Sequence, residues 1–214
     1  MMRTRFFRSL ATLVLVLATA TVSRASTLAL DVTSSAQVFA PGVFDNIGWQ
    51  FSVNAPITAD GLGLFDVDPA GLSESHQVGL WDNSGNLLAS ATVTSGSTFI
   101  ASASSAGDWL FADIAPIVLV PGNYVTGAFF ASNADSVMGN TTITTVPQIS
   151  FLASRASTVG GFGEPGVYGL VEPGVFAANI RVQGPAAAVP EPASMFLLGS
   201  GLATLAIRRR RSTK

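Results

Sequence analysis

The chain has 214 residues, with 11 basic and 13 acidic side chains, one histidine and no cysteine. Disulfide bonds and cysteine-based zinc sites are therefore excluded, so a hydrophobic core must stabilise the fold. Nine of the basic residues lie in the two ends, and residues 26–189 hold only Arg155 and Arg181 against twelve acidic residues, a net charge of −10. This charge repels phosphate and argues against nucleic acid as a partner.

The N-terminus has the three parts of a secretory signal peptide. Three arginines within the first eight residues precede an apolar segment over Leu10–Val22. Small residues at Ser23 and Ala25 then form a cleavage site, and we predict cleavage between Ala25 and Ser26. Residues 1–25 are therefore predicted to be a signal peptide, helical in its apolar part, that sends the chain to the export machinery.

The segment 26–183 has the alternating pattern of β-strands, with turn residues at intervals of about 8 to 12 residues. Trp49, Phe51 and Val53 alternate with polar residues, as in a half-buried strand. Pro116 is expected to separate two short strands, because proline cannot donate to a sheet. Asp82–Asn86 is expected to form a hairpin turn. The predicted strands cover residues 28–32, 49–53, 57–65, 77–81, 87–93, 109–114, 117–120, 124–131, 149–153 and 176–182.

Many short strands and few helical patterns predict an all-β fold, an antiparallel β-sandwich of the jelly-roll kind over residues 26–183. This segment is also similar to an uncharacterised family of bacterial extracellular β-sandwich domains, and the resemblance implies a sandwich without a known activity. The residues that carry it are Gly48-Trp49-Gln50-Phe51, Leu62-Gly63-Leu64-Phe65, His76–Asp82 with Gly85, Leu87-Leu88-Ala89 and Leu119–Tyr124.

The C-terminal segment 189–214 has three parts in a fixed order, after a linker at residues 184–188. Val189-Pro190-Glu191-Pro192 comes first, then the uncharged run 193–207, then Arg208, Arg209, Arg210 and Arg211. The prolines keep the approach extended, and the run predicts a hydrophobic helix of roughly 22 Å, shorter than the ~30 Å hydrocarbon core of a bilayer. The arginines favour the cytoplasmic side and act as a stop-transfer signal. A short span of this kind suits a temporary anchor.

This segment resembles the PEP-CTERM sorting signal, through Val189-Pro190-Glu191-Pro192, Leu197-Leu198 and Gly201-Leu202 in the run, and the arginine cluster. The resemblance implies recognition near Pro190-Glu191-Pro192 by an exosortase, a processing enzyme of the membrane. It also implies a Gram-negative bacterium that makes extracellular polysaccharide.

Few residues carry a candidate chemistry. Asp66, Asp68 and Glu74 lie between two predicted strands. Oxygen ligands at this spacing suit Ca²⁺, but a solvated turn with Asx hydrogen bonds is the preferred interpretation. His76 is expected at a strand end on the surface, and no Gly-x-Ser-x-Gly elbow accompanies it. The glycine-rich stretch 161–166 is expected to be a loop. The three tryptophans are expected in the core, although exposed ones would stack on sugars.

These features predict an exported, non-enzymatic protein of the cell surface or of the biofilm matrix. An inner-membrane-anchored precursor would be processed, and the mature form would lie at the cell surface or outside the cell. No cofactor is expected apart from the candidate Ca²⁺, and extracellular polysaccharide is a further candidate partner. The alternatives are a carbohydrate-binding module that uses surface aromatic residues and Ca²⁺, and a glycan hydrolase with two carboxylates in one cleft.

Overall fold

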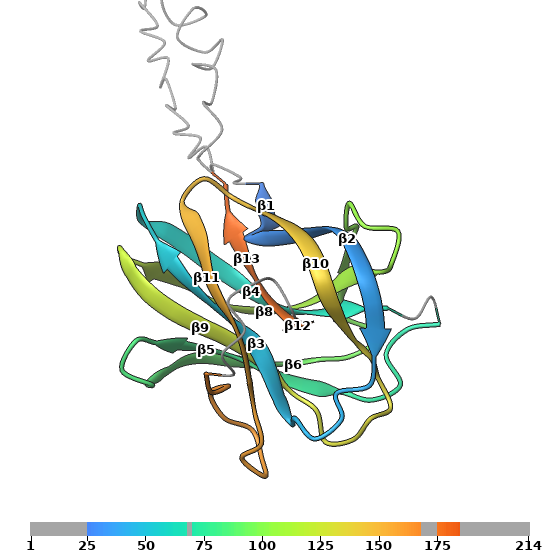
Figure 1. The fold of residues 1–214 in the computed structure, drawn as a ribbon. Coiled ribbons are helices and arrows are strands. Elements are labelled where there is room, and N and C mark those ends of the chain that lie inside the picture. The colour runs from blue at the N-terminus through green and yellow to red at the C-terminus, as the bar shows by residue number, and fades with distance from the viewer. Residues whose placement is uncertain (1–24, 68–69, 168–174, 185–214) are drawn as a thin grey trace, which may run out of the picture. The chain divides into compact units, whose positions relative to one another are not determined.

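The computed structural model describes residues 25–67, 70–167 and 175–184, and these form an all-β domain of antiparallel strands (Figure 1). Sheet 1 has the order β1-β13-β4-β8-β7, sheet 2 the order β12-β10-β2, and sheet 3 the order β11-β3-β9-β5-β6. The strands are β1 (Ser26–Leu28), β2 (Leu30–Phe39), β3 (Asn46–Val53), β4 (Ile57–Asp66), β5 (His76–Asp82), β6 (Leu87–Val93), β7 (Thr98–Ile100), β8 (Asp108–Leu119), β9 (Gly122–Phe129), β10 (Val137–Thr145), β11 (Ile149–Ser157), β12 (Val175–Phe176) and β13 (Ala178–Gln183).

The predicted antiparallel all-β class is confirmed, while the predicted helices at residues 1–25 and 193–207 lie outside the described residues. Strand β3 shows why the alternating pattern was informative. Trp49, Phe51 and Val53 are buried, whereas Gln50 and Ser52 are only half-buried. Alternate side chains of a strand point to opposite faces, so one face of β3 builds the core.

The predicted hairpin between β5 and β6 is also confirmed. Gly85 has a φ of 80° and donates its N–H to the carbonyl of Asp82. The Asp82 carboxylate accepts the backbone N–H groups of Ser84 and Asn86 and the side-chain amide of Asn86. The bonds from Asn86 are the main reason that the pKa of Asp82 lies below its ordinary value.

Strand β8 corrects the prediction of two short strands separated by Pro116. The strand is continuous from Asp108 to Leu119, and its pairing with β4 shifts between Ala59 and Gly61. Residues 114–116 face Asp60 alone, so they form a bulge. Residues in a bulge do not all donate a backbone N–H to the neighbouring strand. Proline, which has no N–H, is therefore tolerated inside this strand.

Several other strands differ from the sequence prediction. The single strand expected over 176–182 is two strands, β12 and β13, which Ala177 separates and which belong to different sheets. Ala29 separates β1 from β2, where one strand over 28–32 was expected, and β2 continues to Phe39. The strands β7 and β10 were not predicted. The second half of β10 is rich in threonine and alternates only weakly in hydrophobicity, so it resembles a loop in sequence; its pairing with β2 stabilises it as a strand.

Aromatic side chains connect the sheets through one core. All three tryptophans are buried, as predicted. Trp49 of sheet 3 donates its indole N–H to the carbonyl of Ala178 in sheet 1, at 2.9 Å. Trp109 of sheet 1 donates to Asp31 of sheet 2, at 3.1 Å. These bonds satisfy the one polar atom of each of these two indoles while their rings fill the core, so Trp49 and Trp109 have structural roles.

Three glycines lie side by side across β3, β9 and β5, and two of them, Gly127 and Gly79, face the rings of a covering loop. Gly48 pairs with Gly127, which pairs with Gly79. A Cβ atom at Gly127 would lie 2.5 Å from the ring of Pro165, and one at Gly79 would lie 2.8 Å from the ring of Phe162. Glycine is therefore required there so that the loop at residues 158–166 can pack on the sheet.

Two side chains at the start of β3 hold this loop in place. The Asp45 carboxylate accepts the N–H groups of Val159 and Gly160, and Asn46 accepts that of Gly163. Burial raises the pKa of Asp45, but these backbone bonds outweigh that effect and lower it. The stretch 161–166 is thus a loop, as predicted from its proline and the absence of a following helix.

Candidate functional site

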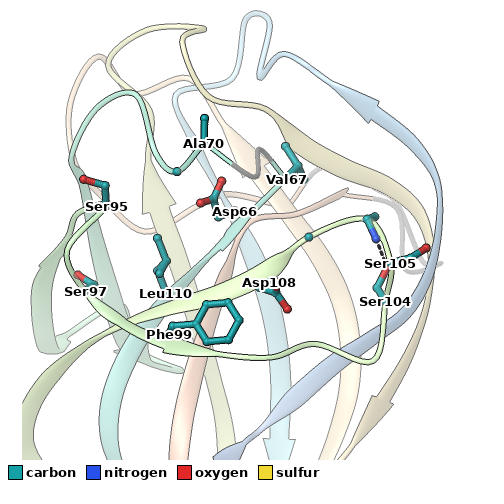
Figure 2. A pocket seen from close by; sticks show the side chains of 13 residues that line it. Asp66, Val67, Ala70, Ser95, Ser97, Phe99, Ser104, Ser105, Asp108 and Leu110 are labelled. Atoms are coloured by element: carbon teal, nitrogen blue, oxygen red, sulfur yellow. Dashed lines mark hydrogen bonds between the residues drawn. The ribbon is translucent and has the colours of Figure 1, made fainter.

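An open cleft of about 590 Å³ lies beside the short edge strand β7 (Figure 2). Its walls come from the end of β4, the turn between β6 and β7, and the loop that precedes β8. We call it the Phe99 cleft. The side chains that line it include Asp66, Ser95, Ser97, Phe99, Ser104, Ser105, Asp108 and Leu110.

Two apolar side chains form the floor of the Phe99 cleft. Phe99 and Leu110 are paired residues of β7 and β8, so they lie on the same face of sheet 1. Leu110 is buried, whereas Phe99 is 61% exposed. Figure 2 shows the Phe99 ring between Ser97 on one side and Ser104 on the other. An exposed aromatic ring in a polar cleft offers a platform on which a ligand can stack.

Hydroxyl and carboxylate groups form the rim of the cleft. The hydroxyl oxygen of Ser97 accepts the N–H of Thr94, and that of Ser104 accepts the N–H of Ala106. Each serine therefore keeps a hydroxyl hydrogen to donate. Asp108 accepts the N–H of Ser102, which fixes its carboxylate at the edge of the cleft.

The two acidic residues of the cleft come from opposite positions of one ladder. Asp66 is the last residue of β4 and pairs with Asp108, the first residue of β8. A Cβ atom at Gly107 would lie 2.0 Å from the Asp66 carbonyl oxygen. Glycine thus lets the loop before β8 approach β4 closely, and this approach brings both carboxylates to the same cleft.

A second group of side chains corrects the prediction for His76. This histidine was expected on the surface, but it is fully buried. Its Nδ1 lies 3.0 Å from the Phe129 carbonyl oxygen, and its Nε2 lies 2.8 Å from Asp135 Oδ2. Both ring nitrogens of His76 therefore have a hydrogen-bonding partner inside the domain. No local pattern indicates these contacts, because Phe129 and Asp135 lie more than fifty residues further along the chain.

Glu74 joins this group, and ligand atoms of Glu74, His76 and Asp135 lie within 4.8 Å of one another. Asp135 also accepts the N–H groups of Ser73, at 2.7 Å, and of Glu74, at 3.0 Å. Burial raises the pKa of Asp135, but these bonds and His76 outweigh it and lower the pKa. The group is a complete hydrogen-bond network that joins the two loops around β5 and β9.

The three Ca²⁺ candidates are only partly described. Asp66 lies in the Phe99 cleft, Glu74 lies beside His76, and Asp68 is outside the described residues. A small cavity of about 50 Å³ lies between Asp66 and Asp135. Calcium binding by the predicted set therefore stays a prediction.

Phe99 was overlooked in the sequence analysis, because the pattern of Thr98–Ile100 does not indicate which side chain remains exposed.

The two ends of the domain meet at one point. Ser26 pairs with Gln183, and Gly184 donates its N–H to the Ala25 carbonyl oxygen at 2.8 Å. Cleavage between Ala25 and Ser26 stays a prediction, although β1 begins at Ser26. Within the described part of the chain, no helix has the length and apolar character needed to cross a membrane.

The predicted sorting and stop-transfer residues, Val189–Pro192 and Arg208–Arg211, lie outside the described residues, so sequence comparison is the test of their role. No curated protein matches the chain. Residues 188–211 match the family model of the PEP-CTERM protein-sorting motif. This match covers both groups of residues, whereas the family of the middle segment is not identified. The chain therefore carries a PEP-CTERM sorting motif, which marks it as an exported, membrane-sorted substrate of an exosortase.

Proposed function

We propose that this protein is a non-enzymatic component of the cell surface or of the extracellular matrix, and that its β domain is a jelly-roll-like sandwich. The sorting motif at residues 188–211 carries this proposal. In the proposed route, the signal peptide is removed after Ala25, and the segment 193–207 holds the precursor in the inner membrane with its arginines on the cytoplasmic side. An exosortase then acts near Pro190–Pro192, and the domain reaches the surface or the matrix.

The charge of the domain supports an extracellular role. The described residues include two cationic side chains, and both have partners in the domain. Arg181 bonds Asp60 and Asp113, each at 2.7 Å, and Arg155 bonds Gln50. The remaining acidic groups give the surface a negative field, which favours solubility and disfavours adhesion to anionic lipid.

The environment of the only histidine argues against serine-type catalysis. His76 is fully buried, and both of its ring nitrogens are already engaged by Phe129 and Asp135. A general base must reach the proton that it removes from a nucleophile or a substrate, and the buried His76 ring does not offer a nitrogen for this.

A carbohydrate-binding module is the second candidate function, because the Phe99 cleft combines an exposed ring with hydroxyl and carboxylate groups.

The experiment that tests the proposed function is fractionation of the native producer. Cells expressing the wild-type chain and a variant without residues 189–214 are separated into cytosol, periplasm, membranes, surface wash, matrix and medium. We expect the wild-type domain in the surface wash or the matrix, and the truncated variant in the periplasm or the medium. An identical distribution of the two chains would overturn the proposal. A variant that lacks residues 1–25 is the control and should stay in the cytosol.

A further inference from the structure

We propose that the Phe99 cleft is a binding site for a neutral glycan, with the Phe99 ring as the stacking platform. This inference rests on the proposed function, since extracellular polysaccharide is met outside the cell, and it names the class of matrix partner. The cleft volume of about 590 Å³ lies within the range of about 300–1,000 Å³ that is typical of ligand sites.

The exposure of Phe99 is the first observation. The ring is 61% exposed although it lies beside the buried Leu110. Its strand, β7, has three residues and forms the edge of sheet 1, so no further strand of that sheet covers it. A sugar ring has an apolar face of C–H groups, and stacking that face on Phe99 would remove apolar surface of both from water.

The polar rim complements the hydroxyl groups of a sugar. Asp66 and Asp108 provide carboxylate acceptors, and the serines provide hydroxyl groups that both donate and accept. The loop before β8 holds Asp108 through the N–H of Ser102, so one acceptor is positioned before a ligand arrives. An apolar platform flanked by acceptors and donors is the arrangement that a glycan requires.

The charge of the cleft selects a neutral ligand. Among the described residues, the charged side chains that line it are Asp66 and Asp108, which would repel a uronic acid, a sulfate or a phosphate group. The two arginines in the described residues contact Asp60, Asp113 and Gln50 instead. The alternative ligand is a cation held by the carboxylates, because Asp66 also borders the small cavity beside Asp135. The test separates these two ligands.

The test measures binding of the full-length chain, purified in detergent, to immobilised polysaccharides by biolayer interferometry. Dextran, galactomannan and a soluble β-glucan are the neutral probes, and alginate is the anionic probe. The variant Phe99→Ala removes the platform. Val118→Ala is the matched control, because Val118 also lies in sheet 1, is 63% exposed and does not line the cleft. Phe99→Trp keeps an aromatic ring.

We expect binding to at least one neutral probe and none to alginate. Phe99→Ala should weaken binding about ten-fold, the loss of one stacking contact, while Phe99→Trp and Val118→Ala retain it. The inference is overturned if no neutral probe binds, if Phe99→Ala binds as the wild type does, or if EDTA abolishes binding and Ca²⁺ restores it irrespective of Phe99. Release of reducing ends would indicate a hydrolase instead. None of these results depends on tail processing, so the sorting proposal is tested separately.

Discussion

The replacement Asp135→Ala tests whether the buried network around His76 stabilises the domain. Asp135 accepts three hydrogen bonds, from Ser73 N–H at 2.7 Å, from His76 Nε2 at 2.8 Å and from Glu74 N–H at 3.0 Å. Its side chain is 6% exposed and that of His76 is fully buried. Removing one partner of such a buried pair costs about 3–5 kcal/mol, because the groups left behind have no acceptor.

For a domain of this size the loss corresponds to a melting temperature roughly 6–20 °C lower. The assay is thermal and urea unfolding of the protein, followed by the fluorescence of its buried tryptophans. Asp113→Ala is the control, because Asp113 is 78% exposed and its partner Arg181 keeps the bond to Asp60. The control should lose less than about 1 kcal/mol. Equal losses in the two variants would refute the reasoning.

The stability difference between the wild type and Asp135→Ala is expected to depend on pH. The pKa of Asp135 in the folded state lies below its ordinary value of 3.8. Its carboxylate therefore stabilises the fold above that value, and the contribution is lost as the pH falls through the folded pKa. The difference in unfolding free energy between wild type and Asp135→Ala should be constant from pH 7 to about pH 5 and close only below about pH 4. A gap that closes near pH 6 would assign the effect to another group.

Three further predictions concern other parts of the chain. Gly127→Ala should displace the covering loop, because its Cβ would lie 2.5 Å from the Pro165 ring, and limited proteolysis should then cut the loop faster. In the control Gly161→Ala the added Cβ meets no atom within 4 Å, so the rate of cutting should not change. Trp49→Phe should lower the unfolding free energy by about 2–3 kcal/mol in urea titrations, through the lost indole bond and a cavity. Glu191→Ala should leave the tail uncut on immunoblots, whereas normal cutting would contradict its role in the sorting motif.

Local patterns predicted the parts of the fold that local chemistry determines. The β5–β6 hairpin was predictable because Asp82 and Gly85 form its turn from residues close together in sequence. Strand β3 was predictable because burial on one face imposes alternation on Trp49, Phe51 and Val53. The sorting motif was predictable because its signal lies in one continuous stretch of sequence and does not depend on the folded domain.

Tertiary contacts determine the rest. Pro116 interrupts the pattern of β8, yet the bulge opposite Asp60 keeps the strand continuous, and only the pairing with β4 reveals this. His76 can be buried because Asp135, which is distant in sequence, forms a hydrogen bond with its Nε2. The candidate cleft was missed for a related reason. Its walls come from three separate segments, and the exposure of Phe99 follows from its place on an edge strand rather than from its neighbours in sequence.

The intact mass of the protein recovered from its native producer tests the central claim most directly. Export followed by sorting predicts a mature chain that starts near Ser26 and ends near Pro190, found in the surface or matrix fraction. The absence of Arg208–Arg211 from that species would show that the tail had been removed. A membrane-bound species that retains Arg208–Arg211 as the only form, or a full-length chain free in the cytosol, would contradict the account.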